Sequence, residues 1–414
     1  MPKLNVTSEI GALKRVIIHT PGYEIEAMTP KEAERDLYND IIPLEAVRSE
    51  YDHLKSFLST VASTYEVTDL LAEAIAADGN KFELLRTLAT LCPIRNRMDE
   101  LMAMGAQELS RLTIEGLPSL ERSLSSMIDP HYFVMRPLPN AYFMRDSAAV
   151  FRGCVLSGAT AFDVRLIESI VTRFIFQHHP DFMAKDFILN GPEERRNYIT
   201  IEGGDFLVLS PTVLAIGVSE RTTADAVERV AANAARKAGE PVSVFAVMIP
   251  RERATIHLDM VFTMIDRDAA LVYGPVVTGR DRARVIRIDA NPKGALSFHE
   301  EDGLLQGLKG AGIDLEPVLC GSGHRLYQER EQWLSGANSF AFAPGKIVMY
   351  SCNSYTLEAL AKAGFAYRKA DDFVEGREKA DDYGRLVVGF DGIELARGGG
   401  GARCMTCPVE REDL

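Results

Sequence analysis

The segment NYITIEGGDFLVLS (residues 197–210) begins the part of the sequence that decides the fold. After a Ser-Pro turn come TVLAIGVS (212–219), ERTTADAVERVAANAARKAG (220–239) and VSVFAVMI (242–249). The two segments around the turn and the last segment are rich in β-branched and aromatic residues, which predicts strands. The third has helical periodicity and ends at a glycine. The predicted order is therefore a hairpin, a helix and a further strand.

The same order recurs toward the C-terminus. Two more hairpins and a following helix are predicted by ATIHLDMVFTMI (254–265) with AALVYGPVV (269–277), NSFAFA (338–343) with KIVMYS (346–351), and YTLEALAKAG (355–364). Such recurrence favours internal repetition of a unit of roughly fifty residues. A closed ring of these units suits the pattern better than a doubly wound parallel sheet, because parallel strands cannot be joined by hairpins.

The first 130 residues predict a different organisation. RVIIH (15–19) predicts a strand, and residues 45–62 predict a helix with one apolar stripe, made up of Val47, Tyr51, Leu54, Phe57 and Leu58. From residue 70 to 129 the chain is rich in Leu, Ala, Met, Glu and Arg and lacks strand alternation. We therefore expect an all-helical insertion at 70–129 within an α/β unit formed by 1–69 and 130–414.

Composition limits the possible partners and compartment. The 414 residues carry a net charge of −13, which argues against a nucleic-acid or anionic-membrane partner, since both need a basic surface. No apolar run is long enough to span a membrane, and the first residues lack the apolar core of a signal peptide. Six scattered cysteines do not form a disulfide framework in a chain of this length. We expect a cytoplasmic protein.

Polar residues stand where the predicted strands meet turns. In the segments NAYFMRDS, IEGGD and IHLD they are Asn140, Arg145, Asp146, Glu202, Asp205, His257 and Asp259. If each repeat places its polar group at the same end of its strand, these groups converge at the centre of the ring. On a strand, His257 and Asp259 would also share one face. The alternatives are a buried histidine that only satisfies the core, and a Gly-Gly pair that only marks a turn or a bulge.

The segment RGGGGARCMTCP (397–408) leaves three interpretations open for Cys404. It could be a nucleophile on a mobile loop, one half of a metal site, or an ordinary thiol. A single C-x-x-C without a second pair is poor for zinc, and no helix follows as in a redox motif. Glycine is selected where the backbone has φ > 0 or approaches another group closely. The run Gly398 to Gly401 therefore favours a loop that delivers a nucleophilic Cys404, with Cys407 as a structural thiol.

These blocks together resemble bacterial arginine deiminases, members of the guanidine-modifying α/β-propeller (pentein) superfamily. The similarity covers almost the whole chain in eight ordered blocks: LKRVIIHTPGYEIEAMTP, LPNAYFMRDS, FQHHP, IEGGDFLVL, SERTTADAVE, IPRERATIHLDMVFTMID, REQWLSGANSFAFAPGKIVMYSCN and CMTCPVER. The resemblance implies a five-bladed pseudo-symmetric α/β propeller as the catalytic domain, with the helical segment as its insertion.

The resemblance also implies hydrolysis of L-arginine to L-citrulline and ammonia, without a metal or an organic cofactor. Its catalytic residues would be Cys404 as nucleophile, His257 as general acid and base, Glu202 as support for the histidine, and Asp146 and Asp259 as ligands of the guanidinium. Its substrate-binding residues would be Asn140, Phe143, Arg165, Asp205 and Arg221, with the two arginines on the substrate carboxylate. The oligomeric state stays open, a homo-oligomer included.

Two other functions remain open. A related enzyme, either an amidinotransferase or a hydrolase of another guanidino compound, would use the same residues, although Arg165 and Arg221 favour a substrate with a carboxylate. A non-catalytic propeller would be free to lose site residues, and the complete set argues against it. The sequence departs from the family pattern at Gly399, where relatives carry a loop arginine, and at Met144, where they carry threonine.

Overall fold

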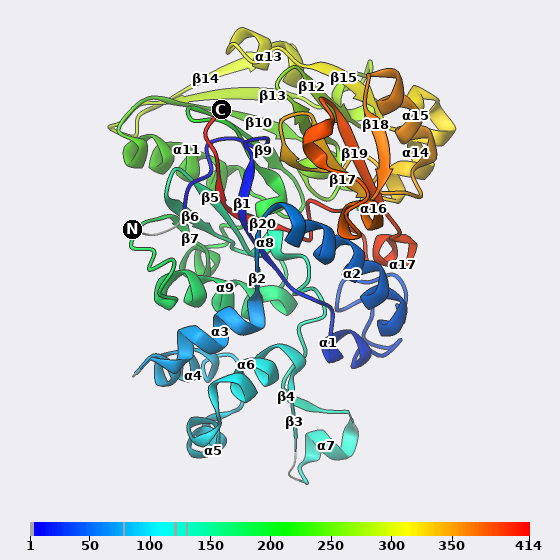
Figure 1. Cartoon of the computed structure of the whole chain (residues 1–414). Helices are drawn as coiled ribbons and strands as arrows, with labels where there is room; N and C mark the ends of the chain where they lie inside the picture. The colour runs from blue at the N-terminus through cyan, green and yellow to red at the C-terminus, as the bar shows by residue number, and fades with distance from the viewer. Residues whose placement is uncertain (1–3, 78, 120–121, 130) are drawn as a thin grey trace.

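The computed structural model describes residues 4–77, 79–119, 122–129 and 131–414, and Figure 1 shows its course. Among the described residues, five sheets contain the same three-strand core. The cores are β20 (Cys407–Arg411), β1 (Leu13–Ile18) and β2 (Ser63–Glu66); β5 (Ala148–Phe151), β6 (Cys154–Ser157) and β7 (Phe187–Asn190); β8 (Phe206–Ser210), β9 (Val213–Val218) and β10 (Val242–Met248); β11 (Phe262–Asp266), β12 (Ala269–Val272) and β15 (Glu316–Leu319); and β16 (Phe340–Ala343), β17 (Lys346–Tyr350) and β19 (Leu386–Phe390).

Each core is built in the same way. Its first two strands pair antiparallel, and the third runs parallel to the second. Three strands extend two of these sheets, namely β13 (Val285–Ala290), β14 (Leu296–Glu301) and β18 (Ala366–Lys369). The predicted hairpins and the α/β class are thereby confirmed, and five cores is the number that the predicted propeller requires.

The helix of the deciding segment also forms as predicted. Helix α11 (Ala224–Ala238) starts where the Thr223 hydroxyl accepts a hydrogen bond from the main chain of Ala226. It ends at Gly239, whose φ of 69° is favourable for glycine. Helix α2 (Leu44–Val61) buries the same five residues that formed the predicted stripe.

Two predicted strands are shorter than expected at the ends that carry polar residues. Strand β8 begins at Phe206 rather than near residue 197, because Gly203–Asp205 form a 3-10 turn. A Cβ at Gly203 would overlap the main-chain oxygen of Arg145, so this turn is fixed by close packing of two backbones. The segment IHLD was also predicted as a strand, and this prediction is wrong: Leu258–Met260 form another 3-10 turn, and β11 starts at Phe262.

The segment between β2 and β5 is mainly helical. It contains α3 (Val67–Ala76), α4 (Asn80–Leu88), α5 (Met98–Ala103), α6 (Ala106–Glu115) and α7 (Leu124–Ile128), together with the short antiparallel pair β3 (Leu117–Pro118) and β4 (Phe133–Met135). Figure 1 shows these helices below the sheets, where α3 packs against α9 (Leu166–His178). Within the described residues, no helix is both long and apolar enough to cross a membrane.

The C-terminal segment is an integral part of the core. Strand β20 pairs with β1, so the two ends of the chain close one sheet. Cys407 is fully buried in this strand, where its Sγ lies 3.4 Å from the main-chain oxygen of Ala148. Because β20 is fixed in this way, the preceding loop with Cys404 is held inside the molecule.

Candidate active site

Seven of the ten predicted site residues line one cavity. They are Asn140, Phe143, Asp146, Arg165, Arg221, His257 and Cys404. The remaining walls come from Leu37, Ile256 and the glycines 398–400. The cavity measures about 30 Å³, enough for about two water molecules. The site is therefore closed in this structure.

Tight turns between the sheets carry the polar side chains. Asp146 lies in α8 (Met144–Ser147), and Asp205 ends the turn Gly203–Asp205 that follows Glu202. His257 directly precedes the 3-10 turn that contains Asp259. These turns contact one another, so the predicted convergence of polar groups occurs although the strand argument behind it was wrong.

His257 is a buried histidine held between two carboxylates. Its Nε2 lies 2.9 Å from Oε2 of Glu202, and its Nδ1 lies 3.6 Å from Oδ1 of Asp146. Burial by itself lowers the pKa of His257, but the two carboxylates outweigh burial and raise it to about 9. The imidazole is consequently protonated at neutral pH and can act as an acid.

Glu202 supports this histidine from behind. Its Oε1 accepts a hydrogen bond of 2.9 Å from the main chain of Ala161, and its Oε2 also pairs with Nη1 of Arg221 at 3.3 Å. Burial would raise the pKa of Glu202, but Arg221 and His257 hold it well below its usual range. Glu202 therefore stays ionised and fixes the orientation of the imidazole.

Asp205 lies behind the cavity rather than in its wall, so its predicted place among the substrate-binding residues is not matched by its contacts. It accepts hydrogen bonds from the main chain of Leu258 at 2.8 Å and from the hydroxyl of Ser219 at 2.6 Å. Burial raises its pKa to about 6. Asp205 thus anchors the turn that carries His257.

Arg165 was predicted to hold a substrate carboxylate, but in this structure protein groups occupy it. Its Nη1 pairs with Oδ2 of Asp146 at 2.5 Å, and its Nε pairs with Glu168 at 2.9 Å. Its Nη2 donates to the main-chain oxygens of Asn140 and Phe143 at 3.3 Å. These contacts fix Asp146 in place and leave little hydrogen-bonding capacity for a ligand.

Arg403 and Glu9 form an ion-pair network that the sequence analysis did not identify. Arg403 Nη1 pairs with Oδ2 of Asp259 at 2.7 Å, and its Nε and Nη2 pair with Glu9 at 2.9 and 3.1 Å. All three side chains are buried. Arg403 directly precedes Cys404 in the sequence, and this adjacency was the one sequence feature that could have identified Arg403 as a site residue. Its role here is to hold Asp259 beside the thiol.

Cys404 lies at the centre of these groups. Its Sγ is 3.8 Å from Oδ2 of Asp259, and its main-chain N–H donates to Oδ1 of Asn338 at 3.3 Å. Burial raises the pKa of the thiol well above its usual value, and the negative charges of Asp259 and Asp146 act in the same direction. With these neighbours Cys404 is a neutral thiol at neutral pH.

The glycine run is required by packing and by backbone geometry. A Cβ at Gly398 would overlap the hydroxyl of Tyr142, and one at Gly400 would overlap the ring of Phe143. Gly399 has a φ of 94°, a conformation that side chains disfavour. The predicted use of the run as a hinge stays a prediction, whereas close approach and positive φ are both present.

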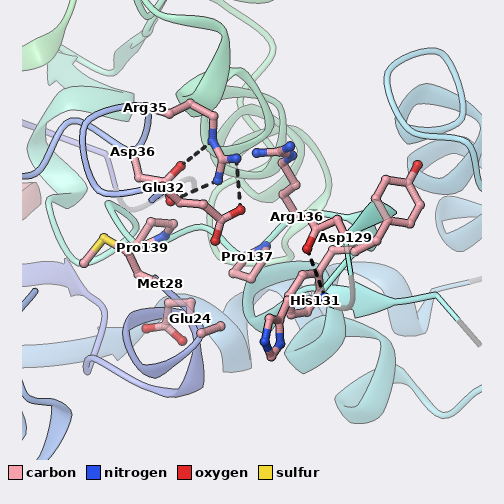
Figure 2. A pocket seen from close by; sticks show the side chains of 13 residues that line it. Glu24, Met28, Glu32, Arg35, Asp36, Asp129, His131, Arg136, Pro137 and Pro139 are labelled. Atoms are coloured by element: carbon pink, nitrogen blue, oxygen red, sulfur yellow. Dashed lines mark hydrogen bonds and ion pairs between the residues drawn. The ribbon is translucent and has the colours of Figure 1, made fainter. Parts of the chain in front are cut away.

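One wall of the cavity comes from the N-terminal segment that carries Leu37. The Asn140 amide donates to the main-chain oxygen of Asp36 at 2.8 Å, so Asn140 both lines the cavity and anchors this wall. Figure 2 shows Arg35 bound to Glu32 and Asp36, next to a separate cavity of about 20 Å³. The ion pairs of this wall thus lie within its own segment.

Four polar atoms around the main cavity are buried without a hydrogen-bond partner among the described residues. They are Oδ1 of Asp146, Oδ1 of Asp259, Nδ1 of His257 and Nε of Arg221. Buried polar groups are normally paired, so such atoms indicate a missing ligand. Two carboxylate oxygens beside a thiol require a ligand that donates several hydrogen bonds and carries positive charge.

A metal ion was not expected, and the donor geometry tests that expectation. Atoms of Asp146, Glu202 and His257 lie within 4.8 Å of one another, a spacing that could hold an ion. However, Arg165 and Arg221 already neutralise the two carboxylates and would repel a divalent cation. A planar organic cation fits the remaining acceptors better than an ion that needs these oxygens as ligands.

Comparison with known proteins shows similarity to arginine deiminases along almost the whole chain. The profile of the arginine deiminase family matches residues 35–411. Arginine deiminases of Limosilactobacillus fermentum and Clostridium perfringens are 37% and 35% identical to this chain, with 99% of it covered and 99% and 98% of those proteins.

Solved structures confirm the predicted α/β fold. The amidinotransferase SxtG from Microseira wollei matches with a TM-score of 0.53 and 13% identity, covering 100% of this chain and 98% of its own. A cysteine-to-serine mutant of DDAH from Pseudomonas aeruginosa, complexed with citrulline, matches with a TM-score of 0.51 and 12% identity, covering 96% and 99%. The family match and the full-length relatives together show that the chain belongs to the arginine deiminase family.

Proposed function

We propose that this protein hydrolyses L-arginine to L-citrulline and ammonia through a covalent intermediate on Cys404. The observation that carries the proposal is that Oδ1 of Asp146 and Oδ1 of Asp259 are buried without a hydrogen-bond partner among the described residues. Asp146 lines the cavity together with Cys404, and the other oxygen of Asp259, Oδ2, lies 3.8 Å from the thiol. A guanidinium is planar and cationic and donates several N–H groups, so it can satisfy both oxygens in one orientation. That orientation places its central carbon against Cys404.

Binding of the cation prepares the nucleophile. In the empty site, burial and two carboxylates keep Cys404 as a thiol. A bound guanidinium adds a positive charge next to Sγ and favours transfer of the thiol proton to water. The thiolate then adds to the guanidinium carbon, so that a C–S bond forms and a tetrahedral adduct results.

His257 transfers the protons in both halves of the reaction. It is protonated at neutral pH, so it donates a proton to one amino group of the adduct. The C–N bond breaks, ammonia leaves, and a thiouronium remains on Cys404. The neutral imidazole next accepts a proton from water as the water adds to the same carbon. The hydroxyl proton of this second adduct passes to the sulfur as the C–S bond breaks, which releases neutral citrulline and restores the thiol.

The closed cavity requires an opening movement before this chemistry. A space for about two water molecules cannot hold an arginine molecule, so at least one wall moves when the substrate enters. The movable candidates are the wall with Leu37 and the glycines 398–400, since the other walls are turns locked by buried ion pairs. Closure afterwards would exclude bulk water from the thiouronium until ammonia has left.

The test is release of citrulline and ammonia from L-arginine by the purified protein. Equal amounts of the two products are expected, with loss of turnover in Cys404→Ala. Cys407→Ala is the matched control, because it removes a buried thiol three residues away, at the start of β20, that does not line the cavity. Full activity of a folded Cys404→Ala variant, or turnover of other guanidino compounds but not of arginine, would refute the proposal.

We also propose the cytoplasm as the compartment of the enzyme. All six cysteines of the sequence are among the described residues, and each is a free thiol. A nucleophilic Cys404 is preserved best in a reducing environment. Loss of activity on mild oxidation, with recovery after addition of a thiol reductant, would support this proposal, and activity indifferent to oxidation would count against it.

A further inference from the structure

Arg253 carries a guanidinium close to Gly399, one of the residues that line the cavity. The residue begins the 3-10 turn Arg253–Thr255, and it is half-buried. Its Nη2 donates to the main-chain oxygen of Arg397 at 3.3 Å, and its Cζ lies 5.7 Å from the ring centre of Trp333. Within the described residues, no carboxylate forms an ion pair with it. Arginines in such half-buried positions usually pair with an anion.

The two arginines inside the cavity differ from Arg253 in this respect. Arg165 pairs with Asp146 and Glu168, and Arg221 pairs with Glu202. Burial lowers the pKa of Arg253, and the nearby charge of Arg221 acts in the same direction. Among the described residues, Arg253 is therefore a cation next to the cavity wall that has no carboxylate partner.

Gly399 adjoins both this cation and the cavity. Gly399 lines the cavity, and a Cβ built on it would lie 3.2 Å from Nη2 of Arg253. The guanidinium of Arg253 thus borders the space that a side chain at position 399 would fill. Its two present contacts, a carbonyl oxygen and an indole face, are weak enough to be exchanged for a carboxylate.

We propose that Arg253 binds the α-carboxylate of the substrate when the cavity opens. The inference rests on the proposed function, in which Asp146 and Asp259 hold the guanidinium end of arginine beside Cys404. In this proposal the opposite end of the molecule lies toward Gly399 and Arg253, while the contacts of Arg165 leave it little hydrogen-bonding capacity. Arg253 and the free Nε of Arg221 then supply the donors for the carboxylate.

The experiment compares substrates with and without the carboxylate. Arg253→Ala, Arg253→Lys and the control Arg251→Ala are assayed with L-arginine, and argininamide and agmatine are measured as substrates or as competitive inhibitors. Arg251 is an exposed arginine two residues away. In Arg253→Ala we expect the KM for L-arginine to rise about 10- to 100-fold with kcat nearly unchanged, the effect of losing one charge-assisted hydrogen bond. The constants for argininamide and agmatine should stay within about twofold, because neither ligand has a carboxylate to bind.

Arg253→Lys should recover part of the affinity, and Arg251→Ala should match the wild type. Equal losses on ligands with and without a carboxylate would show that Arg253 is merely structural, and unchanged KM values would show that it does not bind substrate; either result overturns the inference. Absence of arginine turnover by the wild type would instead refute the proposed function, so the two failures are distinguishable.

A binding measurement gives a second readout that does not need turnover. Trp333 is the only tryptophan in the sequence, and Arg253 lies over its ring. In a Cys404→Ala background, L-arginine should change the Trp333 emission as Arg253 leaves the indole, whereas agmatine should change it much less. Equal changes with both ligands would contradict the proposed movement of Arg253.

Discussion

Replacing Glu202 by glutamine tests how the site sets the protonation of His257. Oε2 of Glu202 accepts from the imidazole at 2.9 Å, and both side chains are almost completely buried. Glutamine preserves the shape but removes the charge. Because the histidine, Arg221 and the main chain of Ala161 all donate to this carboxylate, an amide in its place must turn its NH2 group toward a donor.

The size of the effect follows from the contacts. A hydrogen bond between charged groups contributes about 1.5–3 kcal/mol, and one pKa unit corresponds to about 1.4 kcal/mol. In the wild type the pKa of His257 is about 9, so activity that needs the protonated imidazole should fall as the pH rises through 9. Without Glu202 the charged form is less stable, and the alkaline decline of kcat/KM should move about one to two pH units lower. Loss of orientation should also lower kcat by at least about 100-fold.

The assay is citrulline formation between pH 6 and 10, with kcat and kcat/KM determined at each pH. Glu331→Gln is the control, since Glu331 is also buried and accepts main-chain hydrogen bonds but makes none of its contacts in the cavity. Both variants should lose stability, and only Glu202→Gln should change the pH profile. If kcat/KM declined at the same alkaline pH in Glu202→Gln and in the wild type, the assignment of His257 as the acid would be refuted.

Three further predictions concern stability, the loop and the thiol. Arg403 lowers the pKa of Glu9 from 4.5 to about 2 despite burial. The stabilisation that ionised Glu9 provides is therefore complete above pH 4.5 and is lost as the pH falls toward 2. Glu9→Gln should lower the free energy of unfolding by about 3–5 kcal/mol at pH 7, and urea titrations should show a weaker dependence of that free energy on acid pH. Gly400→Ala should reduce kcat/KM by at least about tenfold through overlap with Phe143, while Gly384→Ala, in open space, should change stability by less than about 0.5 kcal/mol. Cys404 should react faster with a small cationic amidine electrophile than with a neutral amide electrophile of the same size at pH 7, as measured by mass spectrometry, and equal rates would contradict the proposed activation by cations.

The sequence predicts those elements whose signals are local. The apolar stripe of α2 and the caps of α11 follow from helical spacing, a terminal threonine and a terminal glycine. The hairpins follow from β-branched runs around turn residues. In each case the residues that determine the element lie within the element itself.

The errors occur where distant segments determine the local conformation. IHLD alternates like a strand, but the main chain of Leu258 donates to Asp205, and this contact across 53 residues bends the segment into a turn. The strand predicted from residue 197 fails for the same reason, since Gly203 packs against the backbone of Arg145. No periodicity within either segment reports these contacts.

Candidate site residues could be predicted from residue type, but their partners could not. Cys404 and His257 stand out chemically, and the family resemblance adds the carboxylates around them. The pairing of Arg403 with Glu9 joins positions 394 residues apart and has no local signal. For Arg165, binding of a ligand carboxylate stays a prediction, and its pairing with two carboxylates of the protein is a feature that the sequence did not indicate.

These ion pairs explain which atoms remain for a ligand. Arg165 takes one oxygen of Asp146, and Arg403 takes one oxygen of Asp259. Each arginine compensates the charge of its carboxylate in a buried place, where an isolated charge would be strongly unfavourable. Each also leaves the other oxygen, Oδ1, free beside Cys404. The buried arginines therefore do not compete with the substrate for the site. They leave two buried acceptors, one on each carboxylate, whose negative charge a guanidinium can match.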